Sequence, residues 1–119
     1  MWDSAFRAIR YIILFITIGL VEGGAMKNHF GDGVMDGVKC YEPCAVGDMQ
    51  RYCLDYRRGY VCGFAYSLGK RIDDRYLAAC RAGELARQYG LAREAIAEFF
   101  LSGEDSQLQR YYYHGYERN

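Results

Sequence analysis

The fold is decided by the stretch Tyr52-Cys53-Leu54-Asp55-Tyr56-Arg57-Arg58-Gly59-Tyr60-Val61-Cys62-Gly63-Phe64-Ala65. Apolar and aromatic side chains recur every three or four residues from Met49 to Leu68, which is typical of one face of an amphipathic helix. We expect this helix to begin after Asp48, whose carboxylate can accept the free amides of the first turn. Gly69 is placed to end it.

Two glycines, Gly59 and Gly63, lie one turn apart inside this predicted helix. Each costs about 1 kcal/mol relative to alanine in a helix interior. A neighbouring backbone that packs closely against the two positions would account for them. We therefore predict that another segment contacts this stripe through its main chain.

The rest of the chain divides by composition. Residues 26–47 are expected to be a loop or linker, because Met26 to Gly37 is rich in Gly and Asp and lacks helical periodicity. Gly83 to Leu101 is rich in helix-forming residues, and Gly90 allows either one kinked helix or two helices joined by a tight turn. The helical domain is placed at 48–103, and 104–119 is expected to be a Tyr-rich tail. No strand is predicted, so the fold class is all-α.

Residues 1–25 are typical of a secretory signal peptide. Arg7 and Arg10 precede an uninterrupted run without charges from Tyr11 to Val21, and small residues follow it. That run has eleven residues, fewer than the roughly 20 that span a membrane. A cleaved signal, a retained anchor over residues 2–25 and an ordinary buried helix all remain open. The first two readings place the rest of the chain in the periplasm or outside the cell, the anchor at the inner membrane.

Five cysteines are many for a chain of 119 residues, and in an exported protein they favour disulfides. We expect a bridge between Cys53 and Cys80, which would close a loop of about 27 residues and contribute roughly 3 to 4 kcal/mol. Cys40 with Cys44 is the expected second pair. Cys62 would then be a free thiol that faces the core or another chain.

The sequence offers little for catalysis. It contains two histidines, His29 and His114, at opposite ends of the part of the chain that follows the expected signal, so neither is expected to activate a cysteine. The cysteine spacing suits a tetrahedral zinc site poorly, and no phosphate-binding or dinucleotide-binding glycine pattern occurs. We expect no enzyme activity and no cofactor or metal.

One segment resembles the helix-turn-helix of DNA-binding regulators. It runs from Gly83 to Phe100, with Gly90 at the turn. Its recognition helix would be Arg93 to Glu98, which holds one Arg against two Glu and therefore suits phosphate poorly. The chain as a whole has 15 basic and 15 acidic residues and a formal net charge of zero, which also disfavours nucleic acid as a partner.

A second resemblance covers residues 48–101. A Cys-containing helix with the segment Gly59-Tyr60-Val61-Cys62-Gly63 is followed by a short connection and a second cysteine, Cys80. This order resembles the small all-helical periplasmic immunity proteins of the Tai kind, which neutralise peptidoglycan amidases delivered by type VI secretion. Arg81 and Ala82 stand where those proteins carry Pro and Thr, and the Tyr-rich tail replaces their closing helix. The resemblance implies an all-helical, exported inhibitor.

We therefore expect a small exported protein that acts by binding a protein partner, with an immunity or inhibitor protein for a cell-envelope enzyme as the concrete version. The alternatives are a membrane-anchored accessory subunit of an envelope or phage assembly and a helix-turn-helix regulator, and a homodimer remains open. Tyr and Arg are enriched at interface hot spots. The expected partner-binding residues are Tyr56, Arg57, Asp73, Asp74, Arg75 and Tyr76.

Overall fold

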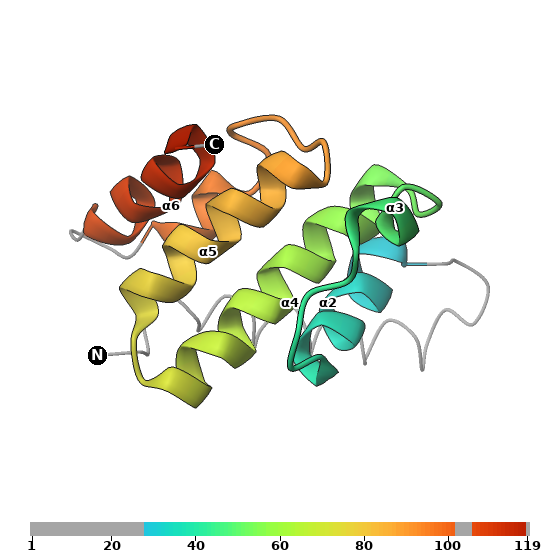
Figure 1. The fold of residues 1–119 in the computed structure, drawn as a ribbon, viewed down its shortest axis with the longest axis horizontal. Helices are drawn as coiled ribbons and strands as arrows, with labels where there is room; N and C mark the ends of the chain where they lie inside the picture. The colour runs from blue at the N-terminus through green and yellow to red at the C-terminus, as the bar shows by residue number, and fades with distance from the viewer. Residues whose placement is uncertain (1–27, 102–105, 119) are drawn as a thin grey trace.

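The computed structural model describes residues 28–101 and 106–118, and this part of the chain is helical with no strand. The prediction of an all-α fold is confirmed. The elements are α2 (His29–Lys39), α3 (Val46–Met49), α4 (Leu54–Ile72), α5 (Arg75–Gln88), the 3-10 helix η1 (Ala97–Phe100) and α6 (Gln107–Arg118). α4 and α5 lie side by side in the middle, with α2 packed on α4 and α6 packed on α5 (Figure 1). The predicted signal or anchor, residues 1–25, lies outside the described residues.

The central helix, α4, begins later than expected. Residues 46–49 form the separate short helix α3, so Asp48 lies in its first turn instead of capping α4. Cys53, with extended backbone, precedes α4. The helix passes the expected end at Gly69 and stops at Asp73, which adopts a left-handed conformation with φ 53° and donates its amide to the Gly69 carbonyl. The core of the predicted helix is confirmed, and its boundaries are shifted towards the C-terminus.

The loop expected over residues 26–47 was partly wrong, because α2 occupies 29–39. Gly and Asp weaken helix propensity, and periodicity gave no signal. The glycines instead form the contact with α4: a Cβ at Gly33 or Gly37 would overlap the α4 backbone. Likewise, a Cβ at Gly59 or Gly63 would overlap backbone carbonyls of α2. The predicted close approach of a second backbone to Gly59 and Gly63 is therefore confirmed, and tertiary packing explains a helix that propensity disfavours.

The C-terminal region also differs from expectation, because the predicted Tyr-rich tail contains the helix α6. α6 packs on α5 through Gly83 and Gly115, at each of which a Cβ would overlap the backbone of the other helix. Tyr112 of α6 is fully buried and stacks on Phe100 with 4.9 Å between ring centroids. Burial of such aromatic surface stabilises the packing of α6.

The helix expected between Gly83 and Leu101 ends at Gln88. Gly90 has φ 75°, and the amide of Leu91 donates to the carbonyl of Ala86 across this turn. The segment that follows consists of turns and η1, without a second α-helix. The segment therefore lacks the second helix that the helix-turn-helix resemblance implies, since Arg93 to Glu98 does not form an α-helix.

The hydrophobic core lies where these helices meet. Its largest fully buried side chains are Tyr112, Phe100, Met49, Leu85, Leu108, Val34, Val61 and Cys62. Cys62 faces the core, one of its two predicted positions, and complete burial raises the pKa of its thiol. Within residues 28–101 and 106–118, no helix is long and apolar enough to cross a membrane.

Candidate interaction surface

None of the five cysteines forms a disulfide in the described structure. The expected bridge from Cys53 to Cys80 is excluded by the topology. α4 and α5 are antiparallel, and a hydrogen bond of 3.0 Å from Arg57 to the Tyr89 carbonyl places the start of α4 beside the end of α5. Cys80 instead lies in the first half of α5, about 20 Å along the helix axes from Cys53. A disulfide needs Cα atoms within about 7 Å.

The other predicted pair, Cys40 and Cys44, lies close to the hydroxyls of Tyr60 and Tyr89. The amide of Cys44 donates to the Tyr60 hydroxyl over 2.9 Å, and the Tyr89 hydroxyl donates to the Cys44 carbonyl over 2.6 Å. Burial and the neighbouring Cys40 thiol raise the pKa of Tyr60. The two cysteines therefore lie near one hydroxyl, both as free thiols, and the two tyrosines attach the segment between α2 and α3 to α4 and α5.

Of the six predicted partner-binding residues, Tyr56 and Arg57 have internal roles. Tyr56 is 8% exposed, and its hydroxyl donates to the Asp36 carboxylate of α2. Burial is the larger cause and this hydrogen bond the second cause of a raised pKa at Tyr56. The Arg57 guanidinium donates to three backbone carbonyls, those of Gln50, Tyr52 and Tyr89, over 2.9 to 3.0 Å. These contacts hold the start of α4 to α3 and α5.

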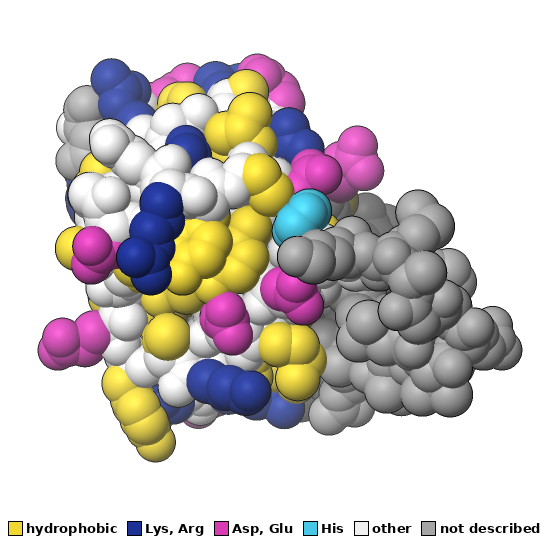
Figure 2. All heavy atoms as spheres, turned by 90° about the vertical axis from the view of Figure 1, so that its right-hand side faces the viewer, with side chains coloured by type: hydrophobic (Ala, Val, Ile, Leu, Met, Phe, Trp, Pro, Cys, Tyr) yellow, Lys and Arg dark blue, Asp and Glu magenta, His cyan; other side chains and the backbone are white. Residues whose placement is uncertain are grey.

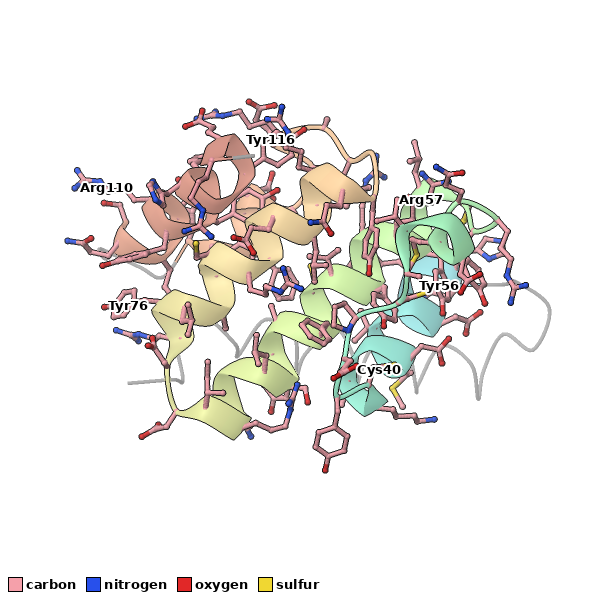
Figure 3. All side chains as sticks on the ribbon, viewed as in Figure 1. Cys40, Tyr56, Arg57, Tyr76, Arg110 and Tyr116 are labelled. Atoms are coloured by element: carbon pink, nitrogen blue, oxygen red, sulfur yellow. The ribbon has the colours of Figure 1, made fainter. Side chains whose placement is uncertain are left out.

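The other predicted residues lie at the opposite end of α4. Tyr76 is on the far side of the molecule from Tyr56 and Arg57 (Figure 3). Asp74 is the N-cap of α5, where its carboxylate accepts the amides of Tyr76 and Leu77. The Arg75 guanidinium lies over the Tyr76 ring at 5.0 Å from its centroid. The six residues therefore do not form one surface, since about 24 Å of α4 separates the two groups.

A groove of about 380 Å³ lies between α4 and α5, close to this second group. Its apolar floor comes from Phe64 and Leu68 of α4, and Tyr41, Ile72 and Leu77 stand on its rim with 76%, 40% and 55% of their surfaces exposed. The complete lining is Tyr41, Pro43, Phe64, Leu68, Ile72, Leu77, Cys80, Arg81, Glu84 and Arg118. Exposed apolar side chains gathered around a concave site are typical of an interaction surface.

The groove carries its charged groups beside α6. The Arg81 guanidinium lies 2.9 Å from the Glu84 carboxylate, and Arg118 of α6 pairs with the same carboxylate. Burial alone would raise the pKa of Glu84, but the hydrogen bonds from Arg81 and Arg118 outweigh it and lower that pKa. This part of the lining therefore holds two guanidinium groups around one ionised carboxylate.

Residues 26–118 match the model of a family described as a protein of unknown function, DUF2623. The chain belongs to this family. The match includes every described helix and the complete lining of the groove, and it begins directly after the predicted signal or anchor. No solved structure matches the chain.

The sequence did not predict the groove of this DUF2623 member, although Cys80, which was expected in a disulfide, is part of its lining. A signal was present in the spacing of Phe64, Leu68 and Ile72, which recur every fourth residue. The same spacing is typical of a buried helix face, however. Only the packing of α5 beside α4 shows that Ile72 and Leu77 remain exposed.

A second set of exposed apolar residues lies on the face that carries α2 and α3. Figure 2 shows hydrophobic side chains in the middle of this face, with acidic and basic side chains around them. Met35, Val46 and Leu54 are exposed on α2, α3 and the start of α4. We favour the groove as the candidate site because it is concave and has an apolar floor.

Among the described residues, no three His, Cys, Asp or Glu side chains lie together as a metal site.

Proposed function

We propose that this chain works by binding another protein, and that the groove between α4 and α5 is the surface it uses. The observation that carries the proposal is the exposure of Ile72 and Leu77 beside the apolar floor of the groove. Covering these side chains on association would remove apolar surface from water, which stabilises a complex by roughly 25 cal/mol per Å² before the costs of association.

The concrete version is an immunity or inhibitor protein for a cell-envelope enzyme, in an exported chain. It is supported by the resemblance of residues 48–101 to periplasmic immunity proteins and by the signal-like segment 1–25. An inhibitor of this kind needs a surface that covers its partner's cleft and requires no catalytic residue. A peptidoglycan-hydrolysing enzyme is the class of partner that the resemblance implies.

The binding proposal is tested by affinity capture from envelope extract with the full chain. The informative variant is Leu77→Asp, which puts a carboxylate on the rim of the groove. Leu54→Asp is its matched control, because Leu54 is 47% exposed, lies in the first turn of α4 as Leu77 lies in the first turn of α5, and is outside the groove. We expect a partner retained by the native chain and by Leu54→Asp and lost with Leu77→Asp. Equal retention by both variants would contradict the role of the groove.

The inhibitor version needs its own measurement. We expect peptidoglycan hydrolysis by the captured partner to stop when the native chain is added in excess, and to continue with Leu77→Asp. Hydrolysis that is unchanged by saturating native chain would overturn the inhibitor version and leave protein binding standing.

A further inference from the structure

Two walls of the groove are helices whose backbones are already hydrogen-bonded. Its third side is the loop with Tyr41 and Pro43, where the Tyr41 carbonyl already accepts from Arg71 and Pro43 has no amide to donate. The lining positions of α4 recur every fourth residue, at Phe64, Leu68 and Ile72, and α5 faces them with Leu77 and Cys80. Phe64 to Ile72 spans about 12 Å, or two helical turns. An extended peptide would find no backbone partners on these walls, and a buried unpaired amide or carbonyl is costly. A helix satisfies its own backbone and presents only side chains.

The lining of the groove contains two guanidinium groups and one carboxylate, so positive charge exceeds negative charge there. Arg81 and Arg118 are 38% and 55% exposed at the side chain, and both pair with Glu84, which is 13% exposed. At the Tyr41 rim, the Arg71 guanidinium lies 4.9 Å from the Tyr41 ring centroid and donates to the Tyr41 carbonyl over 3.1 Å. Carboxylates of an occupant can therefore pair with exposed guanidinium groups.

We propose that the occupant of the groove is an amphipathic helix of the partner protein, with apolar side chains spaced three and four residues apart and a carboxylate beside Arg81 and Arg118. The inference rests on the proposed function, since it names the kind of partner segment that this surface binds. Apolar side chains of the helix cover Leu68, Ile72 and Leu77. The carboxylate shares the two guanidinium groups with Glu84 and sets the direction in which the helix lies.

The test is selection of a displayed library of random peptides on the folded full chain, followed by affinity measurement of the enriched peptides. We expect them to carry apolar residues at helical spacing and an Asp or Glu on one flank. Their affinity should fall about tenfold or more on Leu77→Asp and remain unchanged on Leu54→Asp. Arg118→Gln should lower the affinity of the peptides about threefold to tenfold, and this difference from the native chain should become smaller at high salt. The control Arg110→Gln, on the same helix, should leave the affinity unchanged.

Each other outcome overturns the inference. Enriched peptides without helical spacing or without acidic flanks would exclude the proposed occupant, as would unchanged affinity on Leu77→Asp. Concentration-dependent dimers in sedimentation that disappear with Leu77→Asp would assign the groove to a second copy of this chain. An absence of enriched peptides, combined with capture of a groove-dependent partner from extract, would overturn the helical occupant and leave the proposed function intact.

Discussion

The molecule contains two helix pairs that reach close packing by different means. In the pair α2–α4, four glycines bring the two backbones together over two turns, with Gly33 and Gly37 facing Gly59 and Gly63. In the pair α5–α6, each helix contributes one such glycine. Both pairs also have tyrosine hydrogen bonds. In the first pair the Tyr56 hydroxyl donates to the Asp36 carboxylate of α2, and in the second the Tyr112 and Tyr116 hydroxyls donate to carbonyls of the segment that joins the helices, over 3.1 and 2.7 Å.

The two pairs show that close contact between helix backbones can arise from different glycine patterns. Glycines at i and i+4 make a continuous flat stripe, and such a stripe stabilises a helix that its own composition disfavours. A single glycine per helix makes one point of close approach, and in α5–α6 the fully buried Tyr112 ring, the Tyr116 hydroxyl and the Arg118–Glu84 ion pair supply further contacts. Four sets of variants test this comparison.

The largest effect is expected from Gly63→Ala. The added Cβ meets the Val34 carbonyl, so α2 must move away from α4, and we expect a loss of about 2 kcal/mol or more in the free energy of unfolding. Gly115→Ala, whose Cβ meets the Cys80 carbonyl, should cost a similar amount. Denaturant unfolding followed by circular dichroism measures both.

The control for these changes is Gly47→Ala, because nothing lies within 4 Å of a Cβ at this position. Alanine improves helix propensity there, so we expect an unchanged or slightly higher stability. A negligible cost for Gly115→Ala would mean that α6 can shift and that backbone contact holds only the first pair.

The next effect compares two hydroxyl deletions, one in each pair. Tyr112→Phe removes the hydrogen bond to the Arg93 carbonyl from a fully buried ring, and we expect a loss of about 1 to 2 kcal/mol. Tyr56→Phe leaves the exposed Asp36 carboxylate free to bind water, so its cost should be below about 1 kcal/mol. The same unfolding measurement ranks the two. The reverse order would contradict the stronger dependence of α5–α6 on tyrosine hydroxyls.

The third effect is a pH dependence of the Glu84 ion pairs in the second pair. The pKa of Glu84 is lowered in the folded chain, so its ion pairs stabilise the fold above the pKa of an unfolded Glu, about 4.3, and this contribution is lost as the pH falls through the lower, folded pKa. We expect the native chain to lose more stability than Glu84→Gln between about pH 5 and pH 3. Thermal unfolding across this range measures it, and parallel curves would show that Glu84 adds nothing to α5–α6.

The smallest effect is expected from Leu77→Asp and Leu54→Asp. Both leucines are about half exposed, and a carboxylate in the first turn of a helix interacts favourably with its dipole. Each change should alter the free energy of unfolding by less than about 0.5 kcal/mol. This measurement also separates binding from folding, because a destabilised Leu77→Asp would place Leu77 in the structural core of the hairpin between α4 and α5.

The local sequence pattern predicted those parts of the fold in which the helix propensity of the residues and their tertiary packing favour the same structure. The periodicity around Tyr56 and Tyr60 located the middle of α4, and Gly59 and Gly63 predicted the contact with a second backbone. Local pattern did not predict α2, because the glycines that contact α4 are residues that weaken an isolated helix. It also placed Tyr56 and Arg57 on a partner surface, whereas their side chains bind Asp36 and backbone carbonyls.

The sequence by itself determined the all-α fold of the described residues, the position of the central helix and the need for a close neighbour at Gly59 and Gly63. The tertiary structure decided what that neighbour is, made a helix of the Tyr-rich segment and set Cys53 far from Cys80. It also created the groove, since α4 and α5 supply its walls from positions that read as ordinary core in each helix alone. Periodicity describes one helix at a time, whereas exposure depends on which helices lie beside it.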